Sequence, residues 1–432
     1  DVSWTSRRKR ERTADASGRP HTETCARRAP HPQEGATSGQ KERDLDTGTS
    51  ILLSASALRK NLRFLRKVIG TEPVFSSVIK GNAYGHGIKS FVPMAETCGV
   101  SHFSVFSADE ALRAIRASTE GSSIMIMGFV ADDEVEWAVE SGVSFYVFDL
   151  GRLSAAVEAA KRVGKPAKIH LELESGMHRT GFEGEELEHA VELVSKNPGL
   201  LSVEGTCTHL AGAESIGNHV RVSGQLARFD ELCGWLKQRG LGTGLRHVAS
   251  SAALLTYPES TMDMVRCGIA QYGFWPSTEV RMHHILNHSQ PAGSARRDPL
   301  KRVLTWKSRI MSLKDVEPGH FIGYGTSYQA TRRHRIAAVP TGYFTGFPRD
   351  LSNKGHVLIR GRRATVVGTV NMSMTLVDVT HIAGVERGDE VVIIGSQGRS
   401  AITVASFSDM ADVMNYEALV RLPSEIPREV VD

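Results

Sequence analysis

The sequence has few cysteines, no long apolar run and no large excess of charge of one sign. Five cysteines are spread over 432 residues, and no two have the C-x-x-C spacing of a zinc or redox site. No window approaches the roughly eighteen uninterrupted apolar residues of a membrane-spanning helix, and no basic-then-apolar leader opens the chain. These absences predict a cytoplasmic protein without structural disulfides or a membrane anchor.

The formal net charge is only +4. A charge this small for the chain length gives no field that would favour nucleic acid or an anionic membrane as the main partner. We therefore expect a small-molecule substrate. The chain is long enough for two domains, each with a full core.

The first fifty residues are rich in Arg, Thr, Gly, Pro and Glu, and Val2 and Leu45 are almost their only large aliphatic side chains. Such a segment cannot offset its ordering entropy by burial, so residues 1–50 are predicted to form a disordered tail. The basic cluster at residues 7–10 would also suit a nucleic-acid contact or an address signal, but a solvated tail is the favoured interpretation.

From residue 73 onward, short β-branched runs alternate with helical patterns. The helical stretch 108–118 follows Ser107, which has capping-box spacing with Glu110, and the stretch 151–163 has one apolar face. Eight alternations are typical of a (β/α)8 TIM-type barrel, here over residues 51–299, although a doubly wound open sheet shows the same local pattern. The eight predicted strands are 73–80, 102–107, 122–128, 144–149, 167–174, 201–210, 247–250 and 264–269.

The alternation stops after residue 276. Residues 277–299 are polar and are predicted to be an irregular connection, and no carboxylate or thiolate accompanies its His283, His284 and His288. A solvated loop is therefore favoured over a metal site. Beyond it, close turn signals separate the strand-like runs 356–361, 364–380 and 389–395, which predict a second, mostly β domain over residues 300–432.

Barrel enzymes place their active sites at the carboxyl ends of the strands. The predicted strands end in Lys80, Glu172 and Glu174, His209, Ser250 and Ser251, and Arg266. A lysine at the end of a buried strand is partly desolvated, which lowers its pKa and makes its amine a nucleophile for a Schiff base. The alternative for Lys80 is a side chain that extends from the barrel mouth into solvent.

The last two strand ends offer neutral donors. Ser251, with the backbone of Gly268 and Ile269, stands where barrels usually bind the phosphate of a cofactor. Ser250 and Ser251 also fit a helix cap before the following alanines, and both functions are compatible.

Four further side chains have two interpretations each. Arg266 is either a structural ion-pair partner or a donor to a cofactor ring nitrogen, and His209 is either a core histidine or a site residue. Tyr324 and Tyr343 stand beside glycines, where a phenol can approach a ligand closely, but each also suits a buried core position.

These residues lie in seven motifs that together resemble the alanine racemases, enzymes that use pyridoxal phosphate (PLP). The resemblance runs from about Ser50 to Arg428. The motifs, in family order, are VIKGNAYGHG (78–87), HLELESGMHRTGF (170–182), RHVASSAA (246–253), VRCGIAQYG (265–273), GYGTSY (323–328), VPTGYFTGFPRDLSNKG (339–355) and NYEALVRLPSEIPRE (415–429).

The resemblance assigns expected roles. Lys80 would bind PLP covalently as a Schiff base, Tyr84 would approach the cofactor, and Arg266 would face the pyridine nitrogen. The expected phosphate ligands are Ser251, Gly268, Ile269 and Tyr416. The expected substrate-binding residues are Arg179, Met372 through its backbone, and Tyr343. His209 would hydrogen-bond Tyr324.

Inversion at an α-carbon requires a proton to leave one face and another to be added on the opposite face, so two bases are needed. Lys80 and Tyr324 are the proposed pair. In the family the tyrosine comes from the partner subunit, which implies an obligatory head-to-tail homodimer. Arg266 would stay protonated and leave the ring nitrogen unprotonated, which favours racemisation over transamination.

The sequence departs from the family pattern at three places. Glu172 replaces a lysine that is often carbamylated, Asn371-Met372-Ser373 replaces Cys-Met-Asp, and Ser250 replaces an asparagine. Glu172 is expected to supply a negative group that orients Arg179. Alanine is the expected substrate, and serine or a broad range of amino acids is the alternative. A PLP-dependent decarboxylase and a non-catalytic PLP-binding protein remain as further alternatives.

Overall fold

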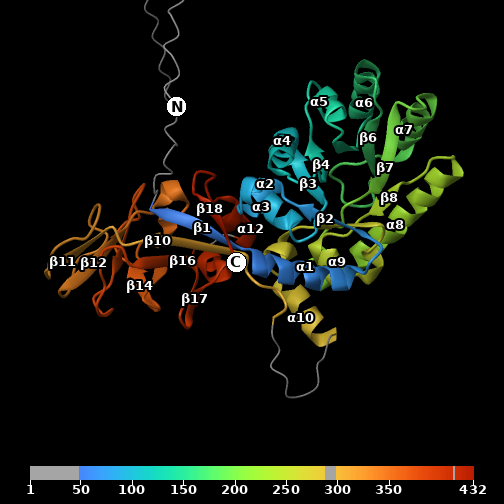
Figure 1. Cartoon of the computed structure of the whole chain (residues 1–432). Helices are drawn as coiled ribbons and strands as arrows, with labels where there is room; N and C mark the ends of the chain where they lie inside the picture. The colour runs from blue at the N-terminus through green and yellow to red at the C-terminus, as the bar shows by residue number, and fades with distance from the viewer. Residues whose placement is uncertain (1–47, 288–297, 412–413) are drawn as a thin grey trace, which may run out of the picture. The chain divides into compact units, whose positions relative to one another are not determined.

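The structure is a computed structural model that describes residues 48–287, 298–411 and 414–432 (Figure 1). The predicted tail and its basic cluster at residues 7–10 lie outside the described residues, apart from Gly48, Thr49 and Ser50. Thr49 already begins a strand. The described residues all belong to one compact unit.

The predicted barrel is confirmed. In the described part of the chain, eight parallel strands follow the order β8-β7-β6-β5-β4-β3-β2-β9. β2 pairs with both β3 and β9, and backbone N–H groups of Asp263 and Arg266 donate to the carbonyls of Arg246 and Ala249, so the sheet nearly closes and is not an open doubly wound sheet. The strands are β2 (Val74–Val78), β3 (His102–Ser107), β4 (Ser123–Phe129), β5 (Ser144–Val147), β6 (Ala167–Glu172), β7 (Leu201–Cys207), β8 (Leu245–His247) and β9 (Met264–Cys267).

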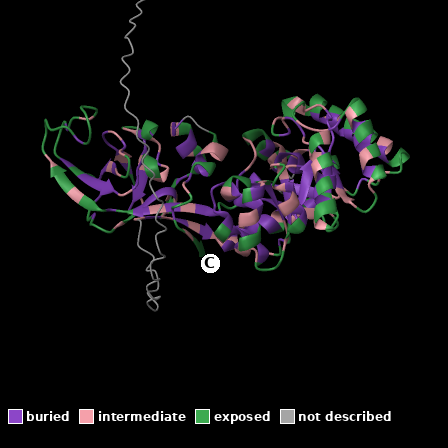
Figure 2. Cartoon of the chain, turned by 90° about the horizontal axis from the view of Figure 1, so that it is seen from above, coloured by how far each residue is buried: buried purple, intermediate pink, exposed green. Residues whose placement is uncertain are grey.

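Helices cover the outside of this barrel, and Figure 2 shows buried residues along the strands and exposed residues on the outer helix faces. They are α1 (Ala55–Ile69), α3 (Ile88–Glu96), α4 (Ala108–Ala117), α5 (Val135–Glu140), α6 (Leu150–Val163), α7 (Gly184–Lys196), α8 (His219–Gln238) and α9 (Ser251–Thr256). The predicted apolar face of α6 is buried. None of the helices in the described ranges is long and apolar enough to cross a membrane.

The predicted capping box at α4 is only half formed. The Ser107 hydroxyl accepts from the backbone N–H of Glu110 at 3.4 Å. The Glu110 carboxylate instead accepts from the N–H groups of Phe106 at 2.9 Å and Asn82 at 3.1 Å. Glu110 therefore ties the segment after β2 to this helix, a long-range contact that cap spacing does not indicate.

The second domain is built on a mixed sheet with the path β11-β12-β15-β14-β13-β16-β10-β1-β18, with β17 paired to β16. Its strands are β1 (Thr49–Ser54), β10 (Leu304–Arg309), β11 (Ser312–Val316), β12 (His334–Val339), β13 (His356–Ile359), β14 (Arg362–Val366), β15 (Thr375–Asp378), β16 (Glu390–Gln397), β17 (Ser400–Ile402) and β18 (Arg428–Val431), accompanied by α11 (Val404–Ala411) and α12 (Asn415–Val420). The buried Trp306 packs between Phe347 and Phe407, with ring centroids 6.4 and 6.1 Å away.

Two expectations need correction. The predicted barrel range 51–299 includes residues 51–54, but these belong to β1, which pairs with β10 and β18 of the second sheet, because strand pairing depends on distant partners. Residues 277–299 were predicted to be irregular, yet α10 (Thr278–Asn287) is a helix, with the Ser277 hydroxyl accepting from the N–H of Val280.

The histidines of α10 have local partners. The His284 ring packs against Phe64 and Trp275, and His283 lies 2.8 Å from the Asn287 amide, while His288 lies outside the described residues. Elsewhere, Cys98, Cys207, Cys233 and Cys267 are free thiols. The cytoplasmic location stays a prediction.

Candidate active site

The chain leaves strand β2 at Val78 and enters a left-handed turn directly after Lys80 (α2, Lys80–Tyr84, in Figure 1). Gly81, Asn82 and Ala83 have φ/ψ angles of 62/44°, 53/49° and 56/48°, and Tyr84 has a φ of 50°. Each of the three non-glycine residues costs roughly 1–2 kcal/mol in this conformation. Such strain persists only where surrounding contacts impose it, and it is concentrated at functional sites.

The turn places the Tyr84 side chain over the end of strand β9. Its buried ring lies 5.1 Å from Tyr272 and 6.1 Å from Tyr416, measured between centroids. A Cβ at position 268 would stand 2.6 Å from the Tyr84 hydroxyl oxygen, so Gly268 is required for this approach. Burial raises the pKa of Tyr84, which therefore stays protonated and can donate a hydrogen bond.

Ser250 and Ser251 make different contacts, and the predicted phosphate binding by Ser251 stays a prediction. The Ser250 hydroxyl caps α9 by accepting from the N–H of Ala253 at 3.4 Å. The Ser251 hydroxyl accepts from the N–H groups of Gly268 at 2.9 Å and Ala270 at 3.3 Å. The same hydroxyl also lies 3.6 Å from the Cys267 Sγ atom. The short helix η3 (Ile269–Tyr272) begins there.

Arg266 is buried and forms no ion pair among the residues that the structure describes. Its guanidinium lies 2.6 Å from His247 Nδ1 and donates to the carbonyl of Thr208 at 2.8 Å. Burial and Arg266 lower the pKa of His247 far below its usual value, so the imidazole is neutral and Nδ1 accepts. His247 Nε2 in turn lies 2.9 Å from His170 Nδ1. No sequence motif marks this histidine pair, and only its position in two predicted strands could have indicated it.

Lys80, Arg179 and His209 lie within one electrostatic environment. Partial desolvation by the surrounding protein and then the charge of Arg179 lower the pKa of Lys80, although its side chain remains accessible. Burial, followed by Arg266, Arg179 and Lys80, lowers the pKa of His209 to about 3. The structure therefore brings these predicted site residues together at one end of the barrel.

The two glutamates after β6 behave differently. Burial raises the pKa of Glu172, which accepts from the Thr180 hydroxyl at 2.9 Å and has no ion pair with Arg179 within the described ranges. The contact that Glu172 makes is therefore with Thr180, and Arg179 acts on this carboxyl group only through its charge, which opposes the rise in pKa. Burial alone would raise the pKa of Glu174, but N–H donors from Gly176, Met177 and His178 lower it.

The remaining predicted residues lie in the second domain, on three neighbouring loops. Tyr324, Tyr343 and Met372 are 73%, 43% and 57% exposed. A Cβ at Gly342 would overlap the carbonyl oxygens of Asn371 and Met372, which shows how closely the Tyr343 segment packs on the Met372 segment. The N–H of Phe344 donates to the Met372 carbonyl at 2.8 Å.

Within one chain these two sets of residues are not joined. In the described part of the chain, no hydrogen bond or ring contact links Tyr324, Tyr343 or Met372 to the barrel residues, and the expected bond from His209 to Tyr324 is not formed. The expected hydrogen bond between His209 and Tyr324 could therefore form only between two chains.

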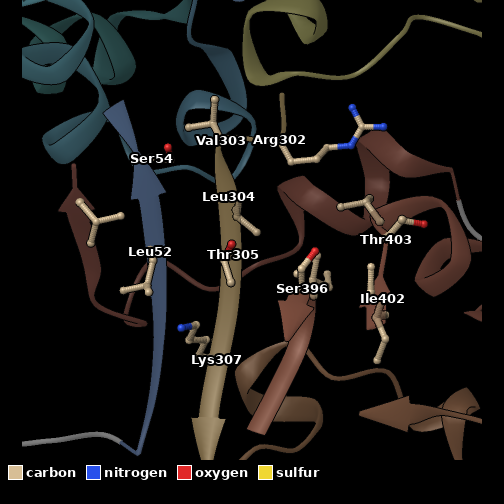
Figure 3. Close-up of a pocket in the computed structure, with 15 residues that line it drawn as sticks. Leu52, Ser54, Arg302, Val303, Leu304, Thr305, Lys307, Ser396, Ile402 and Thr403 are labelled. Carbon is tan, nitrogen blue, oxygen red and sulfur yellow. The ribbon is translucent and has the colours of Figure 1, made fainter. Parts of the chain in front are cut away.

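A cavity of about 300 Å³ lies elsewhere, in the second domain (Figure 3). Its lining includes Leu52 of β1, Thr305 of β10, Ile394 of β16 and Ile402 of β17. It shares no residue with the predicted site, and Figure 3 shows aliphatic side chains such as Leu52 and Ile402 beside polar ones such as Thr305 and Ser396.

Comparison with known proteins identifies the family. The family model described as alanine racemase, N-terminal domain, matches residues 53–276, and the C-terminal-domain model matches residues 303–430. The alanine racemase of Leptospira interrogans is 35% identical over 388 residues, covering 90% of this chain and 97% of the relative. That of Symbiobacterium thermophilum is 36% identical over 375 residues, covering 86% and 94%. The solved alanine racemase from Streptomyces coelicolor A3(2) has a TM-score of 0.79 and 31% identity, covering 89% of this chain and 98% of that chain. This chain belongs to the alanine racemase family.

Proposed function

We propose that this chain interconverts L- and D-alanine with PLP, and that Lys80 and Tyr324 from two subunits exchange the α-proton. The family is one of PLP-dependent isomerases, and relatives that match nearly the whole chain are alanine racemases. The observation that carries the proposal is the strained turn that directs Lys80 and Tyr84 to the same strand ends.

The residues at the barrel end fit PLP. Tyr84 and Ser251 can each donate a hydroxyl proton to the phosphate, and the missing side chain of Gly268 leaves its backbone accessible at that point. The buried guanidinium of Arg266 would donate to the pyridine nitrogen. The chemistry that PLP supplies when bound is withdrawal of electrons from the α-carbon, which makes its proton acidic.

The chain's own residues then move the proton. The lowered pKa of Lys80 increases the fraction of neutral amine, which can accept the α-proton on one face. Tyr324 would serve the other face, while Arg179, Tyr343 and the backbone of Met372 hold the substrate carboxylate. Because a guanidinium group has donors and no acceptor, Arg266 would leave the ring nitrogen of bound PLP unprotonated and limit electron withdrawal, which would favour return of the proton to the α-carbon.

A head-to-tail homodimer explains the exposure of Tyr324, Tyr343 and Met372. In such a dimer the loops of one second domain would cover the barrel end of the other subunit, and each site would use Lys80 and Tyr324 from different chains.

Mixing two inactive variants tests the function and the dimer together. Lys80→Ala and Tyr324→Phe should each lose racemase activity on alanine. After joint refolding in equal amounts, half the dimers would be mixed, each with one intact site, so activity should return to about a quarter of the wild-type value. Separately refolded variants are the control. No recovery would contradict the shared site, and an inactive wild-type protein with bound PLP would contradict the racemase.

Serine is a second candidate substrate, and one observation favours it. The Oδ1 atom of Asn371 is buried and has no hydrogen-bond partner in the described part of the chain. It lies next to Met372 and could accept from the hydroxyl of serine. Enantiomer conversion measured for L-alanine and L-serine in wild type and Asn371→Cys would separate the two, since only serine turnover should fall in the variant.

A further inference from the structure

The strained turn Gly81–Tyr84 is covered by the C-terminal segment 414–431. A Cβ at Gly85 would overlap the carbonyl oxygen of Leu419, and one at Gly81 would stand 3.1 Å from the Val420 side chain. The Tyr416 ring of the same segment lies against Tyr84. The glycines in the turn are therefore positions where another part of the chain occupies the space of a side chain.

Arg428 connects this segment to the turn by hydrogen bonds. Its guanidinium donates to the carbonyls of Pro423 and Ile426 at 2.5 Å each and of Leu422 at 3.3 Å, all within the C-terminal segment. Its fourth bond goes to the carbonyl of Gly85 at 3.0 Å. A planar cation with several donors suits four carbonyls at once, and an ammonium group does not.

The Arg428 stem also packs against the end of the turn. A Cβ at Gly87 would be 3.2 Å from Arg428 Cδ. Burial lowers the pKa of Arg428 to about 10, so the side chain stays cationic at neutral pH. On the opposite side, the Glu110 carboxylate accepts from the N–H of Asn82. The turn is thus held at its beginning by Glu110 and at its end by Arg428.

We infer that Arg428 is a positioning residue that holds the turn in the left-handed conformation in which Lys80 and Tyr84 face one cofactor. The inference rests on the proposed function, because it assigns the turn to PLP binding. Arg428 acts through Gly85 and Gly87, and none of the hydrogen bonds of its guanidinium in the described part of the chain goes to a residue proposed to hold the cofactor. Loss of the Arg428 guanidinium should let the turn relax towards ordinary backbone angles and move Tyr84 away from Gly268.

The test measures PLP affinity by titration of the apo-protein, alongside its thermal unfolding. Arg428→Lys keeps the charge and the stem but cannot bond four carbonyls, and it should weaken PLP binding about tenfold or more. The matched control is Arg66→Lys, because Arg66 donates to the carbonyls of Cys98 and Gly99 and so ties α1 to a different turn. Arg66→Lys should lower the unfolding temperature about as much as Arg428→Lys does, and it should leave PLP affinity unchanged.

Two further measurements complete the test. Glu110→Gln should also weaken PLP binding, and the double variant should lose less than the product of the two single losses, because both residues hold one turn. Hydrogen exchange across residues 82–87 should speed up in Arg428→Lys and not in Arg66→Lys. Arg428→Gln serves as a second variant if Arg428→Lys does not fold.

The outcomes are distinct. Wild-type PLP affinity in Arg428→Lys and Arg428→Gln, an equal loss in Arg66→Lys, or fully multiplicative losses with Glu110→Gln would each overturn the inference. A wild-type protein that binds no PLP would instead overturn the proposed function, before Arg428 is tested.

Discussion

The barrel end and the loop edge of the second domain differ in how completely one chain builds them. At the barrel end, Tyr84, Ser251 and Arg266 are buried and held by contacts with other residues. At the loop edge, Tyr324 and Met372 are mostly exposed. The residues proposed to bind the cofactor are thus already in place in one chain, whereas the residues proposed to bind substrate are exposed. This difference is expected if a second subunit covers the exposed residues and completes the site.

The difference also shows in backbone energy. The barrel end contains a run of left-handed residues, which persists because Glu110 on one side and the C-terminal segment on the other impose it. The loop edge uses glycines at 323 and 325 in the same conformational region without a comparable non-glycine run. Pre-organisation is therefore concentrated where the cofactor is proposed to bind.

The largest expected effect concerns Tyr324 at the exposed loop edge, which is proposed to transfer a proton without binding the cofactor. Tyr324→Phe should slow α-proton removal from one enantiomer by about 10²- to 10³-fold and from the other far less, because the group that accepts the proton on one face is lost. Exchange in heavy water, followed for L- and D-alanine separately, measures this. PLP affinity should not change. Equal losses of rate for the two enantiomers, or weaker PLP binding, would contradict this division between the loop edge and the barrel end.

An intermediate effect tests whether the turn at the barrel end is inaccessible to water. His86 is fully buried, its Nδ1–H donates to the Tyr84 carbonyl at 2.9 Å, and its Nε2 has no partner within the described residues. Burial, with a smaller contribution from Arg428, lowers the pKa of His86 to about 4. Protonation would bury an unpaired charge.

The sign of the resulting pH dependence follows from linkage. Between pH 6.5 and 4 the unfolded chain binds this proton and the folded chain does not, so stability is full above pH 6.5 and falls as pH decreases through that window. The loss approaches about 3 kcal/mol from this residue. His86→Asn keeps a donor but cannot titrate, so urea unfolding should show a shallower pH dependence in the variant. Identical slopes would mean that His86 is not sealed from water.

The smallest expected effect separates the two serines. Ser251→Ala removes the acceptor for Gly268 and Ala270 N–H groups and a donor to the phosphate, so PLP affinity should fall about tenfold. Ser250→Ala is the matched control, because it removes only the helix cap and should cost about 1 kcal/mol of stability with unchanged affinity. An equal loss of PLP affinity in both variants would show that phosphate binding does not depend on Ser251 in particular.

Much of the barrel was predictable because its signals are local. The eight strands were placed within a few residues, since each is a β-branched run followed by a helical pattern, and parallel strands bring their carboxyl ends to one side. Lys80 and Ser251 were identified for the same reason. The helix α10 was missed although Ser277 and Glu279 mark its beginning, because its polar face resembles a loop.

Long-range contacts were not predictable in this way. Nothing in the sequence pairs β1 with β10 and β18, or directs Glu110 to Asn82 instead of its own helix cap. The bond between Arg266 and His247 joins two strands, and Arg428 reaches Gly85 across 343 positions of the chain.

The order of strands and helices, the residue types at the strand ends and the family motifs follow from the sequence alone, because they depend on neighbours in the chain. Which of those residues share an environment depends on how the chain folds in three dimensions. Arg179 lowers the pKa of Lys80, and Arg179 and Lys80 lower the pKa of His209, only because the barrel brings these residues near one another. The left-handed turn likewise exists only because distant residues hold it, since its own residues disfavour that conformation.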